Sequence, residues 1–138
     1  MKKLIALLMA LLMCLALCAC GGPSREEMLA TAQEVSVNDL SNAFYDNKAR
    51  AEANYIGKPL KITGKVHSIE ADHFIFRSTG GQYGVNVYLS KEELMGINKG
   101  DTITVIGIFK NYVVRADGTQ MLGVYYQDSD MKNAFIVK

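Results

Sequence analysis

The sequence contains no cysteine after residue 20. All three cysteines, Cys14, Cys18 and Cys20, lie within the first twenty of the 138 residues. The remaining chain therefore cannot contain a disulfide, and its fold must be held together by an apolar core. A length of about one hundred residues is enough for one domain of this kind.

The chain also lacks an excess of positive charge. The chain has 15 basic and 14 acidic residues. Lys2 and Lys3 belong to an N-terminal segment that has the features of a cleaved signal, described below. Without them 13 basic residues remain, and the net charge of the cleaved chain is near −1. Nucleic-acid-binding modules normally carry a clear basic excess. Nothing in the overall charge steers this chain toward polyanions, and we expect no nucleic-acid partner.

A recognisable set of reactive residues is missing as well. His67 and His73 are the only histidines, and they flank Glu70 and Asp72. This set lacks the tetrahedral ligand spacing and the cysteines of a zinc site, so a solvated turn is the expected structure. No serine stands in a strand–turn–helix elbow. The sequence therefore predicts no metal, no cofactor and no enzymatic activity.

The first residues have the features of a secretory signal. A basic start is followed by an apolar run over residues 4–17, which is too short to span a bilayer comfortably. The run ends in Leu17-Cys18-Ala19-Cys20, which resembles the lipobox of bacterial lipoproteins. The resemblance implies cleavage before Cys20, lipidation of its sulfur, and anchoring on the extracytoplasmic side of the cell membrane. An ordinary secretory signal with incidental cysteines is the alternative.

Two helical patterns precede the strands. Residues 25–34 contain good helix formers, and we expect a partly helical tether there. Residues 37–55 carry apolar side chains at three- and four-residue steps, with Ser36 or Asn38 as a possible cap and Gly57 before Pro59 as a stop. The predicted organisation is a signal peptide over residues 1–19, a lipidated N-terminus and flexible tether over 20–35, and a domain over 36–138 that begins with one amphipathic helix.

Strand and turn patterns follow. Alternating apolar residues predict strands at 60–69, 73–78, 83–89 and 102–109. Ser90 and Glu93 form a capping box for a short helix that Gly96 ends. A hairpin is expected at 116–119, renewed alternation at 122–126, a chain break at 128–130 and a last short strand at 134–137. The placement of residues 111–126 is left open.

Two glycines stand where core residues are expected. Gly64 and Gly107 each interrupt an apolar-alternating segment, over residues 62–66 and 105–109. Such glycines mark bends or close backbone approaches, and two strands that bend where a barrel closes would explain both. The order of helix, three strands, short helix and further strands is that of the OB-fold, a small five-stranded barrel. We therefore predict a mainly β protein with helices, in which an amphipathic helix precedes the barrel. An open sheet with a helix across one face is the alternative.

Short motifs along the chain carry a family resemblance. They are Asp39-Leu40, Asn47, Ala51, Tyr55, Gly57-Lys58, Thr63-Gly64-Lys65-Val66, Lys99-Gly100-Asp101 and Val105-Ile106-Gly107. Together they resemble bacterial lipoproteins with an anticodon-binding-like (tRNA_anti-like) OB-fold domain, over roughly residues 37–137. The resemblance implies the barrel and the membrane anchor, and it implies no activity.

A candidate binding face follows from the predicted barrel. OB barrels bind ligands on the outward face of their second and third strands and on the flanking loops. If Phe74, Phe76, Val85 and Val87 point inward, the outward residues are Lys65, Arg77, Asn86 and Tyr88. Tyr88 beside Arg77 could stack a base or a sugar. An ordinary mixed polar surface is the alternative.

The predicted function is a membrane-anchored, non-catalytic binding module of the bacterial cell envelope. A protein or a glycan is the expected ligand. Two other hypotheses remain open at this point. One is an extracytoplasmic protein that binds single-stranded nucleic acid, and the other is a hydrolase whose reactive residues converge only in three dimensions.

Overall fold

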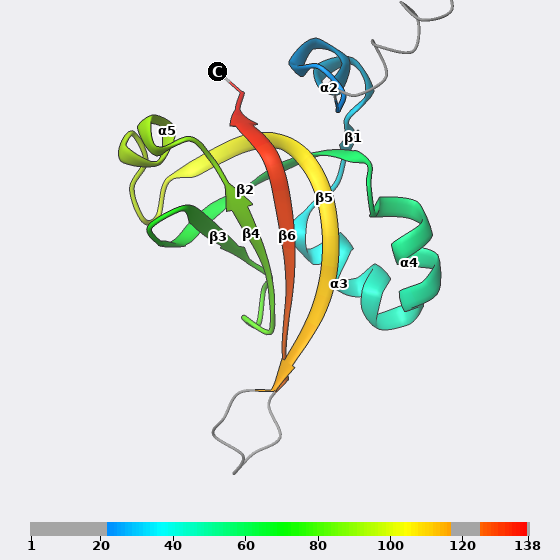
Figure 1. Cartoon of the computed structure of the whole chain (residues 1–138). Coiled ribbons are helices and arrows are strands. Elements are labelled where there is room, and N and C mark those ends of the chain that lie inside the picture. The colour runs from blue at the N-terminus through cyan, green and yellow to red at the C-terminus, as the bar shows by residue number, and fades with distance from the viewer. Residues whose placement is uncertain (1–21, 117–124, 138) are drawn as a thin grey trace, which may run out of the picture.

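The computed structural model describes residues 22–116 and 125–137. Within these ranges the chain forms four helices and six strands (Figure 1). In chain order they are α2 Arg25–Thr31, β1 Gln33–Glu34, α3 Val37–Asp46, α4 Lys48–Tyr55, β2 Pro59–Ile69, β3 His73–Arg77, β4 Tyr83–Tyr88, α5 Lys91–Met95, β5 Thr102–Ala116 and β6 Tyr125–Ile136. None of the helices in these ranges combines the length and the apolar character that crossing a bilayer requires.

The strands close into a barrel. Neighbouring strands follow the order β1-β2-β3-β4-β6-β5, and an additional pairing of β2 with β5 joins the two sides. Strands β2 to β6 thus form a closed five-stranded barrel, in which β4 and β6 are parallel and the other pairs antiparallel. This topology is the OB-fold, as predicted, and the open-sheet alternative is excluded.

Strand β2 serves both halves of the barrel, and it changes partner just after Gly64. Residues 59–65 pair with β5, and residues 66–69 pair with β3. A Cβ atom at Gly64 would lie 2.9 Å from Cδ1 of Phe76, which is closer than real Cβ contacts allow. The missing side chain therefore lets the strand pass directly over the Phe76 ring.

Gly107 has the same role on β5, opposite a bulge in β6. Ile106 pairs with Phe135 and Ile108 with Lys132, so β6 carries one extra residue between these pairs. Asn133 adopts a φ of 51° at this point, as expected for a bulge that bends its strand. A Cβ atom at Gly107 would lie 2.6 Å from Cγ of Met131 and 2.8 Å from Cβ of Ala134. Both glycines thus face the barrel interior, on strands that pair with each other.

The barrel interior is filled by inward-facing strand residues and by helices at its sides. The side chains of Phe74, Phe76, Val85 and Val87 are fully buried, as predicted. From α3, Phe44 packs against Tyr83 and Phe109, with ring centroids 6.3 and 5.9 Å apart. Helix α5 adds Leu94 and begins with the predicted capping box at Ser90. Helices α3 and α5 lie on different sides of the barrel in Figure 1.

Two expectations about the elements are wrong. Residues 37–55 form two helices, because Asn47 adopts extended backbone angles (φ −158°, ψ 91°) and caps α4 by accepting a hydrogen bond from the Arg50 amide. The predicted break at 128–130 lies inside β6, which pairs with β4 and β5 through these residues. Partners on both sides override the weak strand propensity of Asp-Ser-Asp. The predicted hairpin at 116–119, except for Ala116 at the end of β5, and the predicted alternation at 122–126, except for residues 125–126 in β6, lie outside the described residues.

Residues 25–35 are packed on the barrel and do not form the flexible tether that was expected there. Ser24 begins α2 with a capping box, and the helix buries Met28. Strand β1 then pairs in parallel with β2, and the Val35 amide donates to the Lys61 carbonyl at 3.1 Å. Met28 belongs to a second, smaller core on the outside of the barrel, together with Ile106, Ile108 and Phe135.

Candidate functional site: a basic groove beside β2 and β3

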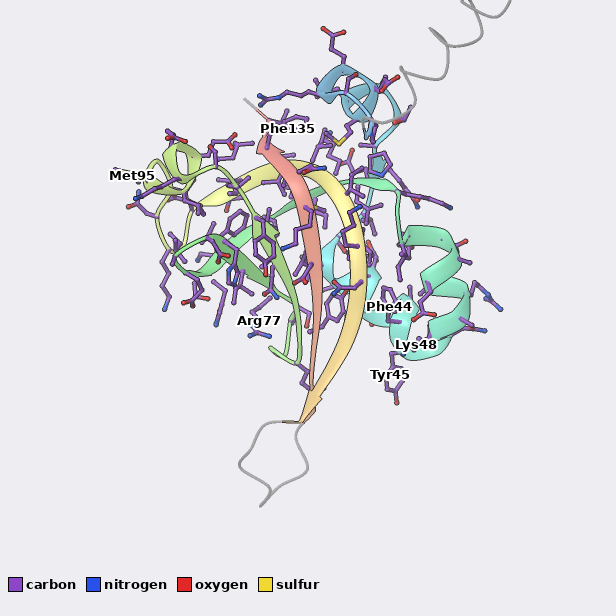
Figure 2. All side chains as sticks on the ribbon, viewed as in Figure 1. Phe44, Tyr45, Lys48, Arg77, Met95 and Phe135 are labelled. Carbon is purple, nitrogen blue, oxygen red and sulfur yellow. The ribbon has the colours of Figure 1, made fainter. Side chains whose placement is uncertain are left out.

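A groove of about 610 Å³ opens where β2 leaves β5 and joins β3. The described residues that line it are Lys65, Val66, His67, Arg77, Ser78, Lys99 and Gly100. We call it the basic groove. Figure 2 shows Arg77 on the β3 side of the barrel, away from α4. The start of α3 comes close to one end of the groove, because Asn38 accepts a hydrogen bond from the amide of Thr79, next to Ser78.

A bulge in β2 shapes one wall of the groove. Val66 pairs with Phe76 and Ser68 with Ile75, which leaves His67 as an extra residue on β2. Bulges of this kind bend a strand and re-aim its side chains. Lys65 and His67 are both exposed at this wall, whereas Val66 between them is buried in the barrel.

The loop between α5 and β5 forms the opposite wall. The Gly100 amide donates to the Val66 carbonyl at 2.9 Å, and the Val66 amide donates to the Asp101 carbonyl at 2.8 Å. Gly100 has a φ of 95°, which a residue with a side chain rarely adopts. These two bonds hold the loop against β2 and place Lys99 at the groove.

The lining of the groove carries positive charge. Lys65, Arg77 and Lys99 are cationic at neutral pH, and no carboxylate is among the described lining residues. The nearby Asp101 carboxylate accepts a hydrogen bond from the Asn98 amide at 2.7 Å, which fixes it within its own turn. A cleft lined by one sign of charge concentrates ligands of the opposite sign. The local charge therefore differs from the balanced charge of the chain.

The structure brings together two of the four predicted binding residues. Lys65 and Arg77 line the same groove. Tyr88 is not beside Arg77: it pairs with His73 at one end of the β3–β4 hairpin, whereas Arg77 pairs with Gly84 at the other. The expected aromatic and cationic platform is therefore absent, because antiparallel pairing separates its two members by four register positions.

Asn86 and Tyr88 have other partners. Asn86 is 6% exposed, and its Nδ2 donates to Oδ1 of Asp130 at 3.1 Å. Lys132 places its Nζ 2.9 Å from the centroid of the Tyr88 ring, a cation–π contact. The His73 ring centroid lies 4.9 Å from that of Tyr88. Asn86 is therefore buried and not part of an exposed binding face, contrary to the expectation, and both side chains are occupied by neighbours within the chain.

Two side chains of the groove, those of His67 and Lys99, were not predicted from the sequence as binding residues. His67 is exposed at the groove because of a bulge, and no residue type near it predicts that bulge. Lys99 belongs to a turn that the Lys99-Gly100-Asp101 motif does predict, but the docking of this turn on β2 is a long-range contact. The Lys99-Gly100-Asp101 turn itself was the available signal.

The described residues contain no group of three or more His, Cys, Asp or Glu side chains placed to hold a metal ion. His73 has a single acidic neighbour: its Nδ1 lies 2.7 Å from Oδ1 of Asp72. This hydrogen bond lowers the pKa of the Asp72 carboxyl below its ordinary value of 3.8. Asp72 is exposed, so the contact is that of an ordinary surface turn.

The closed barrel and its lateral groove define an OB-fold protein with a basic surface site. The sequence matches the tRNA_anti-like family over residues 1–120, and the chain belongs to that family. This confirms the resemblance that the short motifs indicated. Comparison with curated proteins gives no match.

Solved structures share the fold. A "putative nucleic acid-binding lipoprotein" from Klebsiella pneumoniae aligns with a TM-score of 0.56 and 19% identity, over 84% of this chain and 99% of that one. The hypothetical protein ygiW from E. coli aligns with a TM-score of 0.40 and 15% identity, over 77% and 91% of the two chains. Replication protein A of U. maydis, bound to single-stranded DNA, aligns with a TM-score of 0.37 and 12% identity, over 78% and 74%. At 19% identity, the first of these likenesses is one of fold.

Proposed function

We propose that the protein is a lipoprotein of the bacterial cell envelope, anchored through Cys20, whose OB-fold domain binds an anionic glycan without acting on it. The observation that carries the proposal is the convergence of Lys65, Arg77 and Lys99 on one groove. The anchor is supported by the lipobox-like Leu17-Cys18-Ala19-Cys20. It is also supported by the description of the Klebsiella structure as a lipoprotein.

The lining of the groove favours a glycan over a protein partner. Protein interfaces depend on a few aromatic or apolar anchors that fill pockets. The one apolar residue of the lining, Val66, is 2% exposed and belongs to the barrel core. Lysine and arginine pair well with the carboxylate or phosphate groups of an acidic polysaccharide, because charge-assisted hydrogen bonds need no apolar anchor.

The lining also disfavours single-stranded nucleic acid. Proteins that bind single strands stack bases on aromatic side chains along a basic channel. No Phe, Tyr or Trp is among the described residues of the groove, and Tyr88 is covered by Lys132 at the other end of the hairpin. The positive charge alone would suit a phosphate backbone, so nucleic acid serves as the competing ligand in the test.

Binding can be measured by calorimetry with the full-length protein in detergent. The probes are a uronic-acid oligosaccharide, its neutral counterpart and an oligo-dT single strand. We expect the uronic-acid probe to bind most tightly and to lose about tenfold in affinity for each of Lys65→Gln and Lys99→Gln, because hydrogen bonds to charged groups contribute about 1.5–3 kcal/mol. Lys58→Gln is the matched control, since Lys58 is exposed and lies seven residues before Lys65, beyond the other end of β2.

Two results would contradict the glycan assignment. One is equal losses for the groove variants and for Lys58→Gln. The other is tighter binding of oligo-dT than of the uronic-acid probe, which would establish the nucleic-acid function instead.

The anchor is tested separately by cell fractionation. Cys20→Ala removes the sulfur that would carry the lipid, so the protein should move from the membrane to the soluble fraction. Cys18→Ala is the control and should stay with the membrane, because residue 18 precedes the expected cleavage site. Membrane retention of Cys20→Ala would contradict lipid anchoring.

A further inference from the structure

The distance between the proposed lipid and the folded domain is short. Only three residues lie between Cys20 and Ser24, where the capping box of α2 begins, so Ser24 is four positions along the chain from Cys20. A fully extended chain covers at most about 3.6 Å per residue, so Ser24 can lie no more than about 14 Å from the lipidated residue. A compact domain of roughly 110 residues is about 34 Å across, which is more than twice that reach.

Helix α2 cannot act as a loose spacer because it is fixed to the barrel. Met28 is 4% exposed and packs with Ile106, Ile108 and Phe135. Just after the helix, Gln33 and Glu34 pair with Leu60 and Lys61 of β2. The point at which the short linker meets the domain is therefore a rigid part of its surface.

The exposed surface of α2 is mostly polar, but the helix borders a cleft whose lining is largely apolar. A cleft of about 420 Å³ lies between α2, α5 and the end of β6, and it is lined by Arg25, Leu29, Glu93, Phe135, Ile136 and Val137. Leu29 is 51% exposed. Arg25 places its guanidinium carbon 4.0 Å from the centroid of the Phe135 ring. Figure 2 shows Phe135 beside α2, at the end of the barrel opposite to Tyr45.

We propose that α2 and this cleft form the face of the protein that lies against the lipid bilayer, with Leu29 entering the boundary between headgroups and acyl chains. The inference rests on the proposed anchor at Cys20. The short linker supplies the proximity, and the exposed leucine with the apolar cleft supplies the contact. The first turn of α2 carries Glu26 and Glu27 against Arg25 and is net acidic, so the contact cannot draw on attraction to anionic lipid.

The test uses the lipidated full chain, reconstituted in phosphatidylcholine vesicles with and without nitroxide-labelled acyl chains. Leu29→Cys and Tyr45→Cys provide single attachment points for a fluorophore, because Cys14 and Cys18 precede the cleavage site and the Cys20 thiol carries the lipid. Tyr45 is the matched control, as an 83% exposed apolar side chain on α3. We expect quenching at position 29 to be at least about twofold stronger than at position 45, since interfacial residues sit about 5–10 Å into the headgroup region.

Flotation of the same vesicles separates the two proposals. If the protein floats with the vesicles and position 29 is quenched no more than position 45, the membrane-facing surface is refuted while the anchor stands. If the protein does not float, the anchor fails and the surface assignment fails with it. Equal fluorescence of the Leu29→Cys label with and without vesicles, together with a dimer in detergent, would instead assign the cleft to a second copy of the chain. Quenching that is unchanged by adding phosphatidylglycerol would support an apolar contact.

Discussion

The two faces of β5 are buried by different means. Val105 and Phe109 point into the barrel, where strands and helices enclose them. Ile106 and Ile108 point outward and are covered by Met28 of α2 and by Phe135. The barrel core is therefore closed on all sides, whereas the outer core depends on one seven-residue helix. A strand that is buried on both faces has a continuous run of apolar residues, and Val105-Ile106-Gly107-Ile108-Phe109 is such a run. The alternation expected for residues 105–109 is wrong for this reason.

The barrel core and the outer core should differ in how they unfold. The barrel should unfold as one cooperative unit, because each strand is held by two neighbours. Helix α2 is packed on the barrel through Met28 in the native state, but it should open at a lower free energy than the barrel, because one face alone holds it. On our proposal this helix is also the part nearest to the membrane, so its packing sets the orientation of the barrel relative to the bilayer.

The largest loss of stability is expected for Phe109→Ala. Phe109 is fully buried and contacts the Phe44 ring. Removing a buried Phe side chain costs about 3–5 kcal/mol of unfolding free energy, because the lost transfer energy adds to the cost of the cavity. Urea unfolding followed by far-UV circular dichroism measures the change, and a loss below about 1 kcal/mol would contradict a closed barrel core.

A smaller and local loss is expected for Phe135→Ala in the outer core. The side chain is 6% exposed and borders the open cleft, so its surroundings can relax. We expect a loss of about 2–3 kcal/mol or less. Relative to the wild type, Phe135→Ala should accelerate hydrogen exchange of the Ala32 amide, at the C-terminal cap of α2, more than that of the Val66 amide in the barrel. Equal acceleration of both amides would mean that the two cores are one.

The two bend glycines should respond unequally to alanine. At Gly107 the added Cβ meets Cα of Ala134 at 3.0 Å, a backbone atom, as well as Met131. At Gly64 the three nearest atoms all belong to the Phe76 ring, a side chain. Overpacking costs about 1–3 kcal/mol, and the higher part of this range is expected at Gly107 because backbone yields less than a side chain. Equal midpoints of urea unfolding for the two variants would contradict this ranking.

The smallest effect concerns the exposed pair of Asp72 and His73, outside both cores. The hydrogen bond to His73 lowers the pKa of Asp72 below 3.8, its value in the unfolded chain. A folded-state pKa below the unfolded one adds stability above that value, and the contribution disappears as pH falls through the folded pKa. Asp72→Asn should therefore lower the melting temperature slightly at about pH 5, and this difference should shrink as the pH falls below 3.8. A difference that grows toward low pH would have the wrong sign.

Much of the barrel could be predicted from local patterns. Strands β2, β3 and β4 were placed within a residue or two of their observed ends, because one face of each is apolar and the other polar. The capping box at Ser90 located α5. Only the end of β6 was predicted, as a short strand at 134–137. Its middle was missed, because the strand character there comes from pairing with β4 and β5 and not from Asp128, Ser129 and Asp130 themselves.

Two of the four predicted binding residues belong to the candidate site. Alternation placed Lys65 and Arg77 on the outside of the barrel, and both line the groove. The partnership of Arg77 with Tyr88 failed because alternation gives the face of a residue but not its position along the neighbouring strand. Pairing register depends on the turn and on the whole hairpin.

The sequence by itself determined the apolar alternation, the two inward glycines and the helix signals, and these were enough to specify an OB barrel. Only the tertiary structure decided which cations share a groove and that α2 is part of the body of the protein. The reason is physical: local patterns fix the conformation and the buried face of each element, whereas bulges, register and the docking of loops arise from contacts between residues far apart in the chain. The His67 bulge and the Gly100–Val66 hydrogen bond are contacts of that second kind.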